Sequence, residues 1–238
     1  YVLAAVGVFT LVVGAAVRLR RPGDQSSLHF FWLSVAFFGV FAFSPAGRFN
    51  HLDWVFYWAD EISMLALGPM LFHFSLVFPD RSTSWARTTL GARLLPLIYL
   101  PALLMGTARV VAIGGLDQRL DLWRVIAALD RWDPLYLAFC LACGFVVLAN
   151  ALAHVRSVTA QRQLRWIAWG TALGGGPFAV GYALPFALGV APSVRMELLA
   201  IPLGLIPLAF ASAIVRYRLM DVEVIVKRSL VYVAAVAA

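Results

Sequence analysis

The chain has 238 residues, of which 62% are hydrophobic and 13% are charged. A bilayer core about 30 Å thick needs roughly 20 apolar residues of helix, so this composition suffices for about seven transmembrane helices. The net charge of +7 does not indicate nucleic-acid binding, because the sequence has no basic stretch with interleaved stacking aromatic residues. We therefore expect an all-α, polytopic membrane protein whose surroundings are the lipid bilayer.

Seven apolar stretches follow one another along the chain, and Asp60 and Glu61 interrupt the third. After the seventh, a further apolar run from Ser229 to the last residue is the start of a possible eighth helix. Because the chain also begins with Tyr1 in place of an initiator Met, we expect it to be a fragment of a longer protein. The seven stretches cover residues 1–17, 28–43, 55–78, 94–113, 135–153, 166–190 and 198–215.

Positive charge alternates between high and low from one loop to the next. The loops after the first, third and fifth stretches, with the segment after the seventh, hold most of the 19 Lys and Arg residues. Cytoplasmic loops retain such residues during membrane insertion, so we expect the N-terminus outside and the C-terminus in the cytoplasm. Residues 1–215 then form a seven-span transmembrane domain, and residues 216–238 form a cytoplasmic juxtamembrane connector with the start of a further apolar segment.

Aromatic and ionisable side chains in the third stretch are the candidates for a ligand-binding site. Trp54 and Trp58 neighbour Asp60 and Glu61 near the outer end of this stretch, and His73 lies deeper in it. An ionisable residue at membrane depth is a functional-site hypothesis by default. A mouth lined by aromatic and acidic residues suits a small amphipathic or cationic ligand. For His73, the alternative is a neutral imidazole that is hydrogen-bonded to a neighbouring helix.

Cys140 and Cys143 form a C-x-x-C motif one helical turn apart. This spacing occurs in redox pairs and in half of a metal site. The alternative is that both are small side chains at a packed helix interface. Because the sequence has no second Cys pair and no His at a supporting spacing, we favour packing and expect no metal site.

Two other segments carry structural expectations. Gly174, Gly175 and Gly176, followed by Pro177, predict a break in the sixth stretch. Transporters use broken helices at their substrate sites, but two matched halves are not evident here, and kinked helices of a sensor bundle are the simpler interpretation. The outer loop at 114–134 has the composition of a short amphipathic helix, which either lies flat on the membrane or caps a ligand.

The segment after the seventh stretch is basic and partly amphipathic. It reads RYRLMDVEVIVKRSLVY over residues 216–232. Such a segment either transmits a helix movement to a cytoplasmic domain or simply anchors the chain at anionic headgroups. The candidates for signal coupling are Arg216, Tyr217, Arg218, Asp221 and Arg228.

This run resembles the stretch that follows the transmembrane bundle in many bacterial sensor histidine kinases of two-component systems. The phrase LFHFSLVFP at 71–79 resembles the end of a span in the same group. The resemblance implies a multi-pass sensor module in the bacterial inner membrane, homodimeric, with an unknown small-molecule or membrane signal. It also implies a kinase domain outside these residues, which would use ATP and Mg²⁺ and pass phosphate to a response regulator.

No catalytic residue or cofactor of such a kinase is assigned to this chain, because no phosphoacceptor helix or ATP-binding box is present in it. Similar modules precede serine phosphatase and cyclase domains, so these outputs stay open. A small-solute transporter is the alternative from a different class. In that case, His73, Asp60 and Glu61 would form a proton or substrate path.

Overall fold

The structure is a computed structural model that describes residues 2–20, 22–43, 50–78, 88–114 and 127–215. All regular secondary structure in these ranges is helical, which confirms the all-α prediction. The coupling residues and most of the outer loop lie outside the described residues. The elements are α1 (Val2–Arg20), α2 (Gln25–Ala42), α3 (His51–Val77), α4 (Thr89–Leu94), the 3₁₀ helix η2 (Leu95–Tyr99), α5 (Leu100–Gly114), α7 (Trp132–His154), α8 (Val158–Phe178), the π-helix η3 (Ala179–Ala183), α9 (Leu184–Ala187), α10 (Val194–Leu198), the 3₁₀ helix η4 (Ile201–Gly204) and a final helix at 205–215.

Within the described residues, five helical segments are long and apolar enough to cross a membrane. Each coincides with one of the predicted stretches, and together they indicate a membrane protein. By the same measure α3 and α8 fall short, because α3 carries Asp60, Glu61 and His73, and α8 carries Arg162 and Arg165. The five segments are Leu3–Arg20, Gln25–Ala42, Leu95–Gly114, Ala127–His154 and Val194–Val215.

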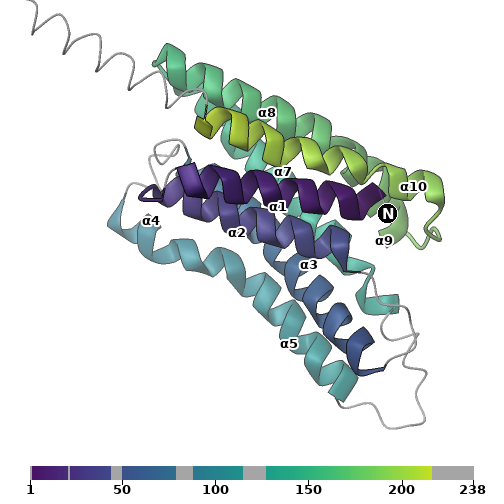
Figure 1. Cartoon of the computed structure of the whole chain (residues 1–238). Coiled ribbons are helices and arrows are strands. Elements are labelled where there is room, and N and C mark those ends of the chain that lie inside the picture. Colours follow the sequence, from purple (N-terminus) through teal and green to yellow (C-terminus); the bar gives the residue numbers. More distant parts are fainter. Residues whose placement is uncertain (1, 21, 44–49, 79–87, 115–126, 216–238) are drawn as a thin grey trace, which may run out of the picture.

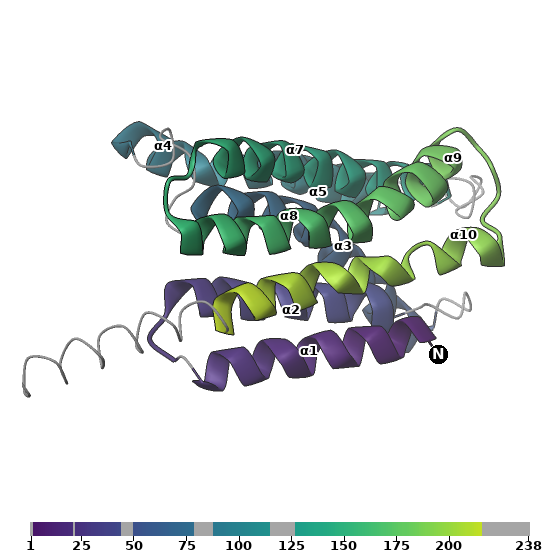
Figure 2. The ribbon, with the colours of Figure 1, turned by 90° about the horizontal axis from the view of Figure 1, so that it is seen from above.

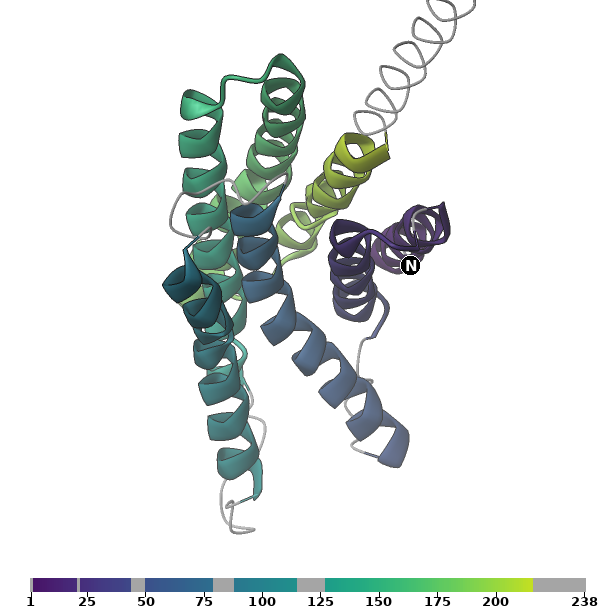
Figure 3. The same ribbon diagram turned by 90° about the vertical axis from the view of Figure 1, so that its left-hand side faces the viewer.

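Six segments form a closed ring. From α1 the contacts run to α2, α3, α7 and α8 in turn, and α8 contacts η4, which returns to α1. In Figure 3, α1 and α2 lie on one side and α7 and α8 on the other, with α3 and the final helix between them. The final helix runs beside α1 and α8 (Figure 2). Outside this ring, α5 lies against α3 (Figure 1).

Side-chain caps explain why several helices begin before their apolar stretch. The amide of Ser26 donates to the side chain of Asp24 at 3.3 Å, and the amide of Asp53 donates to that of Asn50 at 2.8 Å. Ser157 and Ser193 cap α8 and α10 in the same way. These residues satisfy amide groups that have no partner in the first helical turn. Hydropathy detects only the apolar part of each helix, so the predicted starts came several residues late.

Aromatic side chains fill the ring at the end where α3 finishes. The ring of Phe74 meets that of Phe210 edge-on at 4.7 Å and stacks with that of Phe78 at 5.1 Å. Phe30 and Ile214 are fully buried in the same core. Since lipid tails are as apolar as these side chains, close packing is what stabilises this half of the ring.

The predicted break at Gly174–Gly176 is wrong. Here α8 continues through all three glycines, and Gly174 allows close packing: a Cβ there would lie 2.8 Å from the carbonyl oxygen of Pro202 in η4. The irregular π-helix follows at Ala179–Ala183. Pro185 lies two residues beyond its end, and proline lacks an amide hydrogen and clashes with the carbonyl four residues earlier, here that of Gly181 inside the π-helix. The distortion of the sixth stretch therefore arises from Pro185, and the glycines provide helix contact.

The structure supports the packing interpretation for Cys140, the first of the two cysteines. Both are free thiols. Cys140 is buried, and a Cβ added to Gly68 of α3 would lie 3.1 Å from its sulfur. The small residues Gly68 and Cys140 thus allow α3 and α7 to approach each other.

Candidate functional site

A buried arginine links three helices at the opposite end of the bundle. Arg109 on α5 is 2% exposed. Its Nη1 donates to the hydroxyl of Tyr57 at 3.0 Å, to Oδ1 of Asp130 at 2.8 Å and to Oε2 of Glu61. Its Nη2 donates to Oδ2 of Asp133 at 2.6 Å. The network joins α5 to α3 and to the start of α7.

This network fixes an otherwise peripheral helix. The buried residues of α5 are Ala102 and Arg109. The guanidinium carbon of Arg109 also lies 5.9 Å from the centre of the Tyr57 ring, in cation–π range. Removing one partner from a buried ion pair costs about 3–5 kcal/mol, because the other charge stays buried without compensation. Arg109 is thus the main polar attachment of α5.

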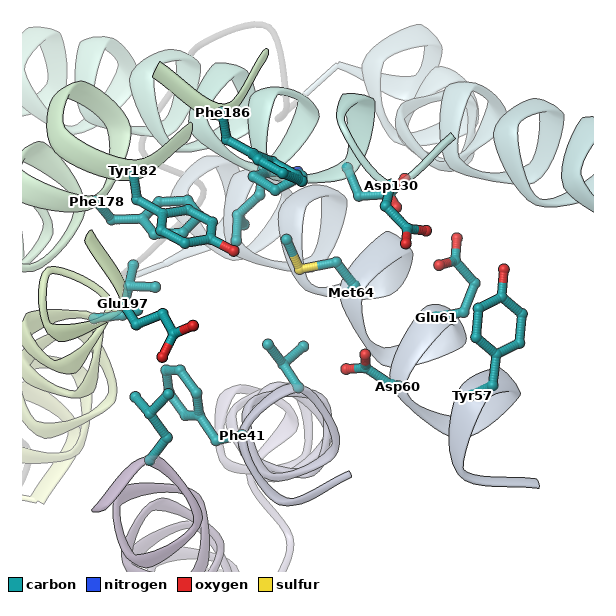
Figure 4. A pocket seen from close by; sticks show the side chains of 17 residues that line it. Phe41, Tyr57, Asp60, Glu61, Met64, Asp130, Phe178, Tyr182, Phe186 and Glu197 are labelled. Carbon is teal, nitrogen blue, oxygen red and sulfur yellow. The ribbon is translucent and has the colours of Figure 1, made fainter. Parts of the chain in front are cut away.

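Beside this network lies a cavity of about 330 Å³. All six segments of the ring contribute residues to its wall (Figure 4), and the lining residue Leu3 places it near the end where α1 begins. The lining residues are Leu3, Val40, Phe41, Tyr57, Asp60, Glu61, Met64, Asp130, Asp133, Pro134, Leu137, Phe178, Tyr182, Phe186, Glu197, Ala200 and Leu203.

One wall of the cavity is acidic. Glu61 and Asp133 are buried, and Asp60 and Asp130 are partly buried. Glu197 of α10 is exposed and reaches the cavity from the opposite side (Figure 4). These five carboxyl groups come from α3, from the start of α7 and from α10, so they are brought together only by the fold.

The other wall is aromatic and apolar. Phe178, Tyr182 and Phe186 follow at intervals of four residues along α8, η3 and α9, and their rings lie next to one another. The centroids of Phe178 and Tyr182 are 5.5 Å apart with nearly parallel planes, and those of Tyr182 and Phe186 are 5.9 Å apart. Phe41 and Met64 face the same space (Figure 4). The cavity therefore offers an aromatic surface, with Glu197 on the same side, opposite the carboxyl groups of α3 and of the start of α7 (Figure 4).

The charges around the cavity are unequal. Arg109 forms ion pairs with Glu61, Asp130 and Asp133. Asp60 and Glu197 have no ion pair or hydrogen bond from their carboxylates to any described residue. A second oxygen of Glu61, Oε1, is buried and has no hydrogen-bond partner in the described chain. One positive charge thus faces five carboxyl groups.

Glu61, Asp130 and Asp133 also satisfy the spacing of a metal site, since one oxygen from each lies within 4.8 Å of the others. However, the guanidinium of Arg109 donates hydrogen bonds to all three. Positive charge already occupies the place where these carboxylates converge. In this arrangement the three carboxylates bind the guanidinium of Arg109, and a metal ion would have to displace the Arg109 side chain.

The structure brings together only part of the predicted ligand site. Asp60 and Glu61 line the cavity. Trp54 and Trp58 do not, although their rings pack on that of Tyr57 with centroids 5.6 and 5.4 Å away.

His73 lies toward the other end of α3. There its Nδ1 is 2.9 Å from the hydroxyl of Tyr99, and its ring is 5.1 Å from that of His29. This contact matches the alternative considered for His73, an imidazole that is hydrogen-bonded to a neighbouring helix. His73 is not among the residues that line the cavity.

Four charged residues of the site were missed by sequence reasoning: Arg109, Asp130, Asp133 and Glu197. Arg109 carried a usable signal, because an arginine within an apolar stretch either extends to the membrane interface or pairs with an acidic residue. The candidates for that partner were the carboxylates predicted on the same side of the membrane. The sequence did not indicate which of them bind it.

Fold and cavity together define the class: an all-helical membrane protein with an internal cavity that is acidic on one side and aromatic on the other. Comparisons of the chain with protein-family models, curated proteins and solved structures found no match.

Proposed function

We propose that the chain is the ligand-sensing membrane module of a bacterial signalling protein. The observation that carries this proposal is that every segment of the six-membered ring lines the same cavity. A ligand held there lies between the helices of the ring, whose positions relative to one another can change. It favours one arrangement of the helices if it binds that arrangement more tightly than the other.

The membrane topology belongs to the same proposal. We infer seven spans, because α3 and the α8–α9 segment take part in the ring with four of the five strongly apolar segments. With the N-terminus outside, the cavity opens on the outer side of the inner membrane, where extracellular compounds have access. The end packed with phenylalanine then faces the cytoplasm.

For the output, we propose a two-component histidine kinase domain that follows the connector, acts as a homodimer and phosphorylates a response regulator. Support comes from the resemblance of residues 216–232, which lie outside the described residues. A serine phosphatase or cyclase domain in place of the kinase would leave the sensory role unchanged.

Filling the cavity tests the sensory role. Ala200 lines the cavity, so Ala200→Phe in the whole protein should hold the helices in one arrangement. The expected result is a fixed level of phosphotransfer that no longer responds to the stimulus. Ala191→Phe, at an exposed position in the nearby loop, is the matched control and should behave as the parent.

Normal signalling by the Ala200→Phe protein would refute the sensor role of the cavity. Solute uptake into proteoliposomes, abolished by the same change, would instead establish the transporter alternative. The connector is tested separately: Arg216→Ala with Arg218→Ala should alter basal or stimulated output while membrane insertion stays normal.

A further inference from the structure

We propose that the cavity binds a small organic ammonium ion that carries an apolar or aromatic group. This inference names the ligand class of the proposed sensor and rests on that function only for the consequence of binding. Binding itself is argued from the two walls of the cavity, from their unequal charge and from the cavity's size.

The first step concerns carboxyl oxygen atoms that lack partners. Asp60 is partly buried and has no ion-pair partner among the described residues, and Glu61 lines the cavity with a buried Oε1 that lacks a hydrogen-bond partner there. Burying charged or polar oxygen atoms without partners is costly. A ligand that brings N–H donors and a positive charge into the cavity supplies the counter-charge and the hydrogen bonds that the carboxylate of Asp60 lacks. An ammonium group has both properties.

The second step concerns the aromatic wall. A cation is attracted to the face of an aromatic ring within about 6 Å, and ligand cavities of this kind combine a few polar groups with an apolar lining. Phe178, Tyr182 and Phe186 provide such a surface opposite Asp60 (Figure 4). An inorganic cation has no hydrocarbon part that could pack against these rings. An alkyl or aryl ammonium ion places its charge at the carboxylates and its hydrocarbon part at the rings.

The third step concerns size and the competing ligand. A cavity of about 330 Å³ is near the lower limit for small-molecule sites, which favours a compact ligand. A divalent metal ion requires several convergent oxygen ligands. The three carboxylates that converge, Glu61, Asp130 and Asp133, already receive hydrogen bonds from Arg109. Of the two lining carboxyl groups without an ion pair to a described residue, Asp60 is partly buried and Glu197 is exposed, so Asp60 is the favoured single contact for the ammonium group.

Calorimetric titration of the whole protein in lipid nanodiscs provides the test. The probes are phenethylammonium, its neutral analogue phenethyl alcohol, and Ca²⁺. We expect the ammonium ion to bind at least about tenfold more tightly than the alcohol, which corresponds to about 1.4 kcal/mol of preference for the charge. We expect that Ca²⁺ does not displace the bound ammonium ion.

Asp60→Asn should weaken ammonium binding about tenfold, by the same arithmetic, with no change for the alcohol. Because Asp60 has no ion-pair partner in the described chain, its neutralisation should leave thermal stability equal or higher. A loss of binding therefore does not reflect misfolding. Asp24→Asn is the matched control: it removes one negative charge from the other end of the bundle and keeps a capping residue.

Equal affinity for the ammonium ion and the alcohol, or displacement of the ammonium ion by Ca²⁺, would overturn the proposal. So would unchanged binding by Asp60→Asn. The two proposals fail differently. Ammonium binding without any change in output refutes the sensor role and leaves the ligand class intact, whereas output that responds to another class of compound through Ala200 refutes the ligand class alone.

Discussion

The same ring of helices is filled at one end and hollow at the other. Near the end of α3, rings such as those of Phe74, Phe78 and Phe210 pack against one another. Near the start of α3, the ring encloses a cavity whose wall contains Asp60 and Glu61. Both halves are built from the same helices, so the difference lies in the side chains and not in the architecture.

The difference indicates which half specifies the fold and which is available for binding. In the closely packed half each contact adds to the stability of the fold, whereas a cavity with unpaired acidic groups lowers that stability. Sites that violate the rules of packing and charge pairing are expected to be functional. The filled end then holds the helices together, and its stability offsets the cost of an open cavity at the other end. The predictions below test this division, beginning with the largest expected effect.

Replacing Arg109 should be the most damaging single change. Arg109→Met leaves Glu61 and Asp133 buried without their cation, which should lower the free energy of unfolding by about 3–5 kcal/mol. The measurement is unfolding by SDS in mixed micelles, followed by tryptophan fluorescence. Arg131→Met, at an exposed neighbouring position, is the control. A loss below about 1 kcal/mol would show that the network does not hold α5.

Neutralising the partners sharpens that result. Glu61→Gln and Asp133→Asn, combined with Arg109→Met, remove the unpaired charges and should restore part of the lost stability. If the triple variant is no more stable than Arg109→Met alone, the loss arises from packing and not from charge.

Truncating a ring at the filled end should reduce stability without affecting the cavity. Phe74→Ala should cost about 3 kcal/mol, because the space left between α3 and the final helix cannot close completely. Phe139→Ala, at a position that is 65% exposed, should change little. Ammonium affinity measured on folded Phe74→Ala protein should stay within about twofold of the parent. A tenfold loss would show that the two halves are coupled.

The positions of the helices could be predicted because each apolar stretch is a local property of the sequence. The partners of Arg109 could not: Glu61 and Asp133 are 48 and 24 residues away from it in the chain. Which carboxylates meet it depends on how α3, α5 and α7 pack. Asp60 and Glu61 were found because they interrupt an apolar stretch, whereas Asp130, Asp133 and Glu197 sit in or beside loops where acidic residues are common.

The glycine run of α8 offers a test of close packing within one sequence motif. A Cβ at Gly174 would lie 2.8 Å from the Pro202 carbonyl oxygen, whereas one at Gly176 meets nothing within 4 Å. Gly174→Ala should therefore destabilise the protein by about 1–3 kcal/mol through overpacking. Gly176→Ala should be neutral or stabilising by up to about 1 kcal/mol, since alanine favours the helix. The reverse order in SDS unfolding would contradict the packing of α8 on η4.

The smallest effect concerns His73, which sequence reasoning assigned to the ligand site and the structure places outside the cavity. Tyr99→Phe removes the hydroxyl that lies 2.9 Å from Nδ1 of His73 and should cost about 1 kcal/mol of stability. Neither Tyr99→Phe nor His73→Gln should change ammonium affinity, because the cavity wall contains neither residue. If His73→Gln abolishes binding while Asp60→Asn does not, the site lies at the filled end. The division between a packed half and a binding half would then be wrong.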